Sequence, residues 1–475
     1  MTGLVGKRTG ADLRSALRAL ERWGETPVVV EDSLDPKLEI ARHYMDNFAT
    51  SPAHPRPGGE PMVLYANPVG YDMPVLMGVF GTRARCETLL GAGAGGAAGK
   101  IANDLAARLP VRDLGTAGPA QARTLPGMLA DLPLLTVTGR DAGPYLTSGL
   151  VVARDPMSGV VNVSIHRMRM LSPDRLTIWM LPGRDLELLY RRAMEAGKSL
   201  PVSINIGAPP AVYLTSSISS PFLRTDESEL ELAGAVAGHP ISVCRCTSQD
   251  AWCLADSEIV IEGEITAECR DEYDDAGAPF GMPEFLGYMG MGKAGLPVVS
   301  VTRVTTRPEP YYQTFLGPGK EQSELLAIPT EAGMLARLGP LLQDHGSIRG
   351  AHYLPAAGGQ LVLALQVEKR TDTAEFPRQV LEAAMGCHAL LKAVILVDAD
   401  VDIHSESDLF WALATRFQPS RDLTVLSGRK GFPLDPSQAA GYLAGSSEPT
   451  TDKYLMDLTV PVADRDRFRR VSELV

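Results

Sequence analysis

The pattern of hydrophobic and polar positions divides the chain into three regions, and the first region begins with a helical pattern. Over 11–23, leucines recur on one face with charged residues opposite, which predicts an amphipathic helix. A short apolar run at 28–30 predicts a strand, and a second helix is expected over 36–48. The Pro- and Gly-rich stretch 51–61 predicts a loop. The chain therefore opens with an α/β segment.

Between about 133 and 310 the pattern changes to short apolar runs separated by Gly and Pro turns. The expected strands are 134–137, 160–165, 176–180, 202–206, 241–244, 259–261 and 298–304. One helix, over 184–197, interrupts them. Many short strands with few helices indicate a barrel or sandwich core.

After about 323, helical and strand patterns alternate again, which predicts a separate α/β domain. Its expected elements are a helix near 330–341, a strand at 360–367, a helix at 374–390, a strand at 393–397 and a charged helix over 465–475. The expected fold class is α/β (α+β), with boundaries at 1–322, 323–460 and 461–475.

Composition excludes several classes of protein. The 475 residues carry a formal net charge of −12 without a basic block, which disfavours nucleic acid or an anionic membrane as partner. The six cysteines form no C-x-x-C pair, so a zinc site or a disulfide scaffold is not indicated. No apolar run approaches the roughly 20 residues of a membrane span, and the first residues lack a signal-peptide pattern. We expect a soluble cytoplasmic enzyme.

The Gly/Ala-rich stretch 91–100 contains G-x-G-x-x-G but does not match a phosphate-binding loop. Ala94 and Ile101 occupy positions that the Walker pattern reserves for other residues. A Gly/Ala loop leading into a helix is the preferred interpretation.

Polar residues gather on one predicted strand. Asn162, Ser164 and His166 share one face, and Arg167 points to the other. An edge strand with solvated side chains is the alternative to a functional surface.

A second polar group follows a Gly-x-Pro-Pro turn that starts at Gly207. Thr215, Ser216 and Ser217 expose hydroxyls and carbonyls that suit a hard cation or a phosphate. The alternative is a helix N-cap. Without a G-x-S-x-G elbow, a serine nucleophile is not indicated.

A third candidate is Glu284, which stands between Pro283 and Phe285 in an apolar, turn-rich segment. Burial raises the pKa of a carboxylic acid, as a general acid near neutrality requires. A loop carboxylate that points at water is the alternative.

Taken together, these segments resemble the UbiD family of prenylated-flavin-dependent decarboxylases. The resemblance is collinear from the first helix to Pro433 and rests on the order and spacing of many short motifs. They include Asp12-Leu-Arg14, Asp35-Pro-Lys-Leu-Glu39-Ile, Asn162-x-x-x-x-Arg167, Ile206-Gly-Ala-Pro-Pro210, Thr215-Ser-Ser217, Ala233-Gly-Ala-Val-Ala-Gly238, Glu258-Ile-Val-Ile-Glu-Gly263, Pro279-Phe-Gly281, Gly287-Tyr288, Thr415-Arg416 and Gly431-Phe-Pro433.

The resemblance implies prenylated FMN bound on a split barrel through Mn²⁺ or Mg²⁺ on its phosphate. Asn162 and Glu229 match two metal ligands, and Asp185 stands where the family usually has His. Asp remains a hard oxygen ligand, while an alternative uses Arg184 on the phosphate directly. A K⁺ ion beside the metal would take Glu229 and the carbonyls of Thr215, Ser216, Ile218 and Arg416. The implied cofactor-binding residues are Asn162, Ser164, Ile165, His166, Arg167, Arg184, Thr215, Ser216, Ser217 and Glu229.

The resemblance also implies a catalytic Glu–Arg–Glu trio. Arg167 and Glu284 match it directly, and Glu272 is preferred over Asp275 for the first Glu because of an insertion before Pro279. Arg167 would hold the substrate carboxylate and pair with Glu272, and Glu284 would donate the proton. Phe285, Phe432 and Leu434 are the expected substrate-pocket residues.

The implied activity is reversible, non-oxidative decarboxylation of an α,β-unsaturated or (hetero)aromatic acid, with a natural-product intermediate as one candidate substrate. The alternatives are a flavin oxidoreductase on a split barrel and a non-catalytic subunit of a decarboxylase complex. A flavin prenyltransferase would supply the cofactor. The family's C-terminal domain dimerises, and the segment after Pro461 shows no partner in its own domain. We therefore expect a homodimer or larger homo-oligomer in which that segment crosses to a neighbouring subunit.

Overall fold

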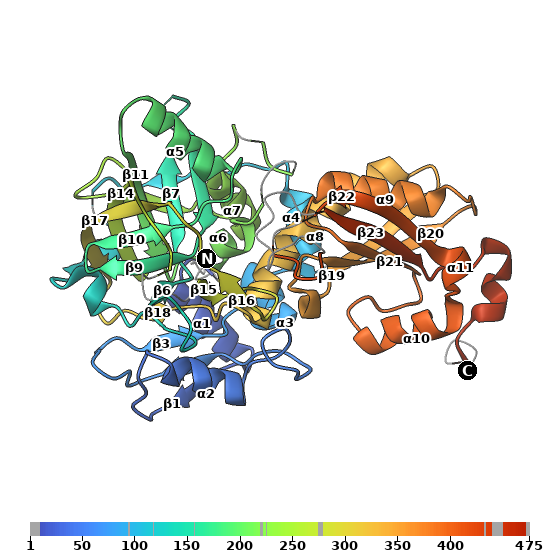
Figure 1. Cartoon of the computed structure of the whole chain (residues 1–475), viewed down its shortest axis with the longest axis horizontal. Helices are drawn as coiled ribbons and strands as arrows, with labels where there is room; N and C mark the ends of the chain where they lie inside the picture. The colour runs from blue at the N-terminus through green and yellow to red at the C-terminus, as the bar shows by residue number, and fades with distance from the viewer. Residues whose placement is uncertain are drawn as a thin grey trace, which may run out of the picture. The chain divides into compact units, whose positions relative to one another are not determined.

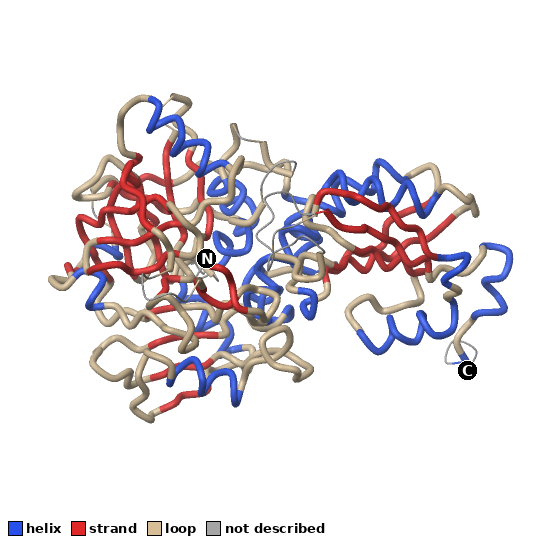
Figure 2. Tube along the Cα trace, viewed as in Figure 1, coloured by secondary structure: helices blue, strands red, loops and turns tan. Residues whose placement is uncertain are grey.

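The computed structural model describes residues 10–93, 96–116, 118–155, 157–218, 222–224, 226–273, 279–431, 434–438 and 450–471. The chain forms two compact units, Met1–Leu325 and Leu326–Val475. Figure 1 labels their elements, and Figure 2 separates helices from strands.

The first unit begins with a small sheet of strand order β1-β2-β3-β18. Its strands are β1 (Val28–Val30), β2 (Val63–Tyr65), β3 (Val75–Met77) and β18 (Tyr312–Gln313), and its helices are α1 (Leu13–Arg22), α2 (Glu39–Asn47), α3 (Arg83–Leu90) and α4 (Gly96–Asp104). The Asp12 side chain caps α1 by accepting a hydrogen bond from the Ser15 amide at 2.7 Å. The expected α/β opening is confirmed, and α4 begins inside the Gly/Ala-rich stretch.

A curled sheet forms the centre of this unit (Figure 1). Its strand order is β6-β9-β10-β17-β14-β11-β7-β8, with β5 paired to β17. The strands are β5 (Arg123–Thr124), β6 (Tyr145–Leu146), β7 (Leu150–Arg154), β8 (Val161–Ile165), β9 (Met168–Ser172), β10 (Arg175–Ile178), β11 (Leu200–Ile206), β14 (Ile259–Arg270) and β17 (Leu296–Thr306). The helices α5 (Asp185–Glu195) and α7 (Glu229–Ala237) contact β11 and β8, respectively, and α6 (Pro210–Thr215) contacts α7.

Smaller elements complete the first unit. They are β4 (Arg112–Asp113), β12 (Ser242–Arg245), β13 (Trp252–Leu254), β15 (Phe280–Pro283), β16 (Met289–Met291), and the 3₁₀ turns η1 (Pro119–Gln121) and η2 (Met128–Asp131).

Two strand predictions differ from the structure. The stretch 134–137 forms only isolated bridges, because it enters a buried turn in which the Val137 amide donates to Asp141. The run 259–261 is the start of the much longer β14. Polar residues enter its second half and β-bulges shift its register against β17, so the apolar pattern ends before the strand does.

The second unit is a five-stranded sheet of order β19-β20-β21-β23-β22. Its strands are β19 (Gly346–Tyr353), β20 (Val362–Lys369), β21 (Ala393–Asp398), β22 (Leu423–Lys430) and β23 (Thr450–Asp457). Its other elements are α9 (Phe376–Cys387), α10 (Glu406–Arg416), α11 (Pro419–Asp422), η3 (Pro355–Ala357) and η4 (Val462–Phe468). The expected alternation of helix and strand is present.

The helix α8 (Lys320–Leu342) is twice as long as predicted, because Pro329 and Pro340 lie inside it instead of marking its ends. By length and a mean hydropathy of 1.2 it could cross a membrane, but 61% of that window is buried within the protein. Buried core helices have the same composition.

The end of the chain does not form the predicted helix over 465–475. Residues 462–468 form the 3₁₀ turn η4, and residues 472–475 lie outside the described ones. Arg470 pairs with Asp408 at 2.7 Å and lies 3.9 Å from the centre of the Trp411 ring. The segment therefore has partners in its own unit, and the argument that it lacked them is wrong.

Candidate active site

The polar strand predicted around Asn162 is β8. The Asn162 amide donates to Glu229 at 3.1 Å, and the Ser164 hydroxyl contacts His166 Nε2 at 2.8 Å. His166 Nδ1 lies 2.9 Å from the Trp179 carbonyl, which assigns its proton to Nδ1. Burial lowers the pKa of His166 to about 4, so it is neutral at physiological pH. β8 is the outer strand of its sheet, as the alternative supposed, but these side chains are bonded to one another and to Glu229 instead of to water.

Glu229 begins α7 and is 3% exposed. Its carboxylate also accepts from the Val163 amide at 3.0 Å. Burial raises the pKa of Glu229 to about 8, and the nearby Asp185 adds to this rise against the opposing hydrogen bonds. Glu229 is thus a desolvated carboxylate bonded to the Asn162 amide, and Asp185 lies close enough to act on it electrostatically.

The catalytic trio proposed from the sequence is assembled around Arg167. Arg167 Nη2 donates to Glu272 at 2.8 Å, and Nη1 donates to Glu284. Burial disfavours the charged form of Arg167, but the negative charges of Glu284 and Glu272 hold the pKa of Arg167 above its ordinary value. Its guanidinium carbon lies 4.8 Å from the centre of the Trp179 ring. Glu284 is 8% exposed, which excludes a carboxylate pointing at water, yet its partner is a cation and its surroundings are not purely apolar.

Glu272 is held from several sides. It is 1% exposed, accepts from the Lys293 amide at 3.0 Å and from the Tyr145 hydroxyl at 3.3 Å, and its backbone carbonyl accepts from Arg169 at 2.7 Å. The structure therefore places Glu272 beside Arg167. The competing Asp275 lies outside the described residues.

The Thr215-Ser-Ser217 run begins at the last residue of α6, with Ser216 as its C-cap, so the N-cap interpretation is wrong. The hydroxyls of Thr215 and Ser216 donate to backbone carbonyls of their own helix, those of Ala211 at 2.8 Å and Tyr213 at 3.0 Å. What remains for a ligand at this point is the carbonyl-rich end of a helix.

The other predicted residues are distributed over both units. Ile165 ends β8, and Arg184 is the backbone N-cap residue of α5. Phe285 is buried in the first unit and Leu434 in the second, where Arg416 pairs with Asp400. Phe432 lies outside the described residues.

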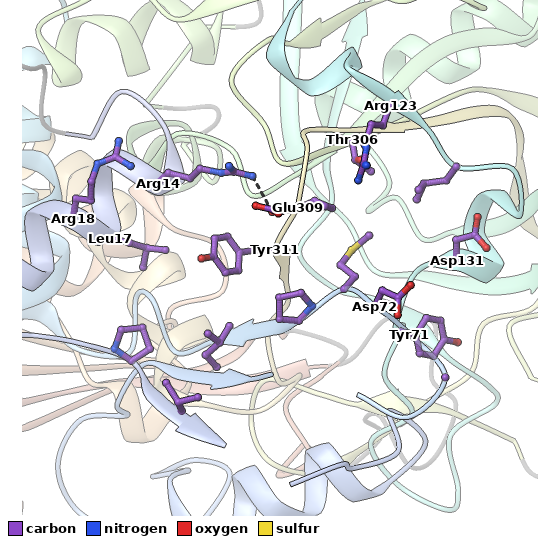
Figure 3. A pocket seen from close by; sticks show the side chains of 18 of the residues that line it. Arg14, Leu17, Arg18, Tyr71, Asp72, Arg123, Asp131, Thr306, Glu309 and Tyr311 are labelled. Carbon is purple, nitrogen blue, oxygen red and sulfur yellow. Dashed lines mark hydrogen bonds between the residues drawn. The ribbon is translucent and has the colours of Figure 1, made fainter. Parts of the chain in front are cut away.

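A cavity of about 970 Å³ lies elsewhere in the first unit (Figure 3). It is lined by α1, by the end of β17 and by the loop before β18, with Arg14, Thr306 and Tyr311 among its residues. Lys293 precedes the start of β17 and Thr306 is its last residue, so the cavity and the trio lie toward opposite ends of this strand.

Comparison with known proteins identifies the family. Models of the N-terminal, Rift-related and C-terminal domains of 3-octaprenyl-4-hydroxybenzoate carboxy-lyase match residues 17–105, 116–320 and 329–457. The chain belongs to the UbiD family. It is 35% identical to gallate decarboxylase of Lactiplantibacillus plantarum over 342 residues, which are 71% of this chain and 69% of that protein. It is 30% identical to phenolic acid decarboxylase of Bacillus subtilis over 475 residues, with 96% and 94% covered.

Solved UbiD-class structures have the same fold. The 3,4-dihydroxybenzoic acid decarboxylase of Klebsiella pneumoniae has a TM-score of 0.89 at 31% identity, with 97% of this chain and 96% of that chain covered. The UbiD-class enzyme HmfF from Pelotomaculum thermopropionicum, in complex with FMN, has a TM-score of 0.85 at 31% identity, with the same coverage. The UbiD chain described here is a carboxy-lyase, and the expected flavin cofactor and α/β architecture are supported.

The metal site of this UbiD chain was predicted as Asn162, Asp185 and Glu229. Among the described residues, no three His, Cys, Asp or Glu side chains are grouped so as to hold a metal ion. The predicted set has only two such side chains, and the amide of Asn162 would have to complete it.

Sequence reasoning missed two residues beside the trio, Trp179 and Lys293. Trp179 follows β10 and faces both Arg167 and Lys293, whose ammonium lies 5.8 Å from the centre of its ring. Lys293 is a single lysine after two glycines in an apolar segment, and that position alone was the available signal.

Proposed function

We propose that this UbiD chain catalyses reversible, non-oxidative decarboxylation of an α,β-unsaturated or (hetero)aromatic carboxylic acid with prenylated FMN. The observation that carries the proposal is a buried arginine bridging two carboxylates next to a polar strand. Arg167, Glu272 and Glu284 supply a carboxylate anchor and a proton donor in one place.

Arg167 can receive a substrate carboxylate. Its two terminal nitrogens are bonded to the glutamates, but its Nε is buried without a hydrogen-bond partner among the described residues. An incoming carboxylate can accept from Nε and compete with Glu284 for Nη1. Binding would thereby release Glu284 from its cation.

The two glutamates then have different roles because their surroundings differ. Glu272 keeps its backbone and tyrosine donors and stays with Arg167 as an anion. Glu284, once released from Arg167, is the proposed donor of the proton to the carbon that loses CO₂.

The cofactor cradle is proposed at Asn162, Glu229 and Asp185. Their hard oxygen atoms fit Mn²⁺ or Mg²⁺, and the raised pKa of Glu229 indicates a carboxylate that a cation would stabilise. Arg184 is the alternative phosphate ligand, and the carbonyls of Thr215, Ser216 and Ile218 are proposed for K⁺. Prenylated FMN, when bound, supplies the electron sink of the reaction.

The test is production of the protein together with a flavin prenyltransferase. We expect a bound cofactor with the mass of prenylated FMN, about one divalent ion per chain and CO₂ release from an unsaturated or aromatic acid. Glu229→Ala should lose the cofactor while retaining the fold by circular dichroism. Active protein that contains no metal contradicts the cradle, and nicotinamide-dependent redox activity without CO₂ release supports the oxidoreductase instead.

The substrate class depends on the acid-binding pocket, for which Phe285 is the proposed residue in the first unit. Replacing Phe285 with Ala should shift the preference between acids of different size more than it lowers cofactor content. An unchanged ranking of acids argues against this pocket.

For assembly we propose a homodimer or a larger homo-oligomer through the second unit. The strand β22 is the outer strand of the described sheet, with Leu423 and Val425 more than two-fifths exposed. Sedimentation of a monomer at micromolar concentration contradicts the proposal.

A further inference from the structure

Lys293 is a second cation at the trio and is held there by its backbone. The Glu272 amide donates to the Lys293 carbonyl at 2.7 Å, and the Lys293 amide donates to Glu272 Oε2 at 3.0 Å. This two-way bond fixes the root of the lysine side chain beside the carboxylate that pairs with Arg167.

Two glycines that precede Lys293 bring this segment close to Glu284 and to Tyr273. A Cβ on Gly290 would lie 2.7 Å from Glu284 Oε1, and a Cβ on Gly292 would lie 2.8 Å from the Tyr273 ring. Because only glycine fits at these two approaches, the lysine backbone can pass next to both acidic residues.

The lysine ammonium and the Arg167 guanidinium share one aromatic ring. Their centres lie 5.8 Å and 4.8 Å from the centroid of Trp179. Burial and then Arg167 lower the pKa of Lys293, while Glu284 and Glu272 oppose that change. The lysine is thus electrostatically coupled to all three members of the trio.

The charge balance of the site requires a second cation. With Arg167 alone, two carboxylates already exceed the positive charge, and an acid substrate would add a third anion to a buried site. With Lys293 present, two cations oppose Glu272 and the substrate carboxylate, and Glu284 is the proposed acid.

We propose that Lys293 is a substrate-binding residue that holds the acid's carboxylate together with Arg167. This inference rests on the proposed function, because it assumes that the acid binds at the trio. It assigns to Lys293 the discrimination between an anionic acid and an uncharged analogue of the same shape.

The experiment measures binding of matched ligand pairs to flavin-loaded protein by calorimetry. The probes are 4-hydroxybenzoate with 4-hydroxybenzamide, and 3,4,5-trihydroxybenzoate with its amide. The variants are Lys293→Met, the charge-retaining Lys293→Arg, and as a control Lys198→Met, an exposed lysine between α5 and β11.

Lys293→Met should weaken binding of the carboxylates about 10-fold and leave the amides unchanged. Lys293→Arg should recover most of the loss, and Lys198→Met should match the unaltered protein. Equal losses for acid and amide would indicate a structural role and overturn the proposal, as would unchanged carboxylate affinity in Lys293→Met or wild-type protein that prefers neither ligand.

The same measurements separate this inference from the proposed function. Wild-type protein that binds the acids through Lys293 but releases no CO₂ from any acid contradicts the decarboxylation and leaves the lysine assignment standing. CO₂ release together with an unchanged KM for the acid in Lys293→Met contradicts the lysine assignment and leaves the decarboxylation standing.

Discussion

Strand β14 is flanked by a buried glutamate at each end, Glu258 immediately before it and Glu272 two residues after it. Twelve residues at roughly 3.3 Å each separate the two ends by about 40 Å. Each glutamate is paired with arginine, at 2.8 Å in both cases. The two clusters have similar charges but differ in how completely their donors are bonded.

At the Glu258 end no buried nitrogen of Arg14 or Arg307 lacks a partner among the described residues. Arg14 grips both carboxylate oxygens and also donates to the carbonyls of Pro308 and Glu309, as Figure 3 shows in part. Arg307 donates to Asp12 and to the backbone at Ser257. This arginine network holds α1 and the end of β17 to the sheet.

At the Glu272 end the network is incomplete. Arg167 Nε is buried and unbonded among the described residues, one glutamate is bound by a single arginine nitrogen, and an aromatic ring faces two cations. Unsatisfied buried donors are costly, and they persist where a ligand completes them. The difference supports a stabilising role for the Glu258 end and the proposed catalytic role for the Glu272 end.

The same substitution at each end tests this difference, and Glu284→Gln should have the largest effect. Removing a general acid typically costs about 10²–10⁴-fold in turnover. We expect kcat to fall by that order while flavin content, spectrum and melting temperature are retained. Near wild-type turnover of any accepted acid would assign the proton to another group, with Glu272 and Asp275 the next candidates.

Glu258→Gln should have the opposite profile. Breaking a buried arginine pair costs about 2–4 kcal/mol, because Arg14 loses a charged acceptor while Gln brings a donor toward its guanidinium. Urea denaturation should show the loss in the free energy of unfolding. Activity per folded molecule should be unchanged, and a fall in kcat would mean that this end is not purely structural.

The sequence predicted the trio but not its surroundings. Arg167 and Glu284 stand in motifs whose spacing is retained, so their positions could be read directly. Trp179 reaches the site through the register of β10 against β9, and Lys293 reaches it through the turn before β17. Both arrangements depend on strand pairing in three dimensions, which the sequence pattern does not give. For the same reason β14 was predicted at a quarter of its length, since its bulges interrupt the apolar alternation.

Glu272→Gln should be intermediate. The amide retains the size and can still accept from Lys293 and Tyr145, but it loses the charge that orients Arg167. A charge-assisted hydrogen bond contributes about 1.5–3 kcal/mol, so kcat/KM should fall about 10–100-fold, with KM raised. A loss confined to kcat would instead make Glu272 the proton donor.

Trp179→Phe should have the smallest effect and tests whether the shared ring matters. Phenylalanine keeps an aromatic face, but its weaker quadrupole reduces a cation–π attraction that contributes about 0.5–2 kcal/mol in all. Because Arg167 and Lys293 both face this ring, a weaker face should loosen carboxylate binding a few-fold, raising KM with little change in kcat.

Phe280, which lies 5.6 Å from the guanidinium of Arg140, offers the control Phe280→Leu, which removes a cation–π contact that does not involve Arg167. A KM that rises equally in both variants would mean that the indole only fills space, whereas a rise specific to Trp179→Phe shows that the ring positions the two cations for the acid.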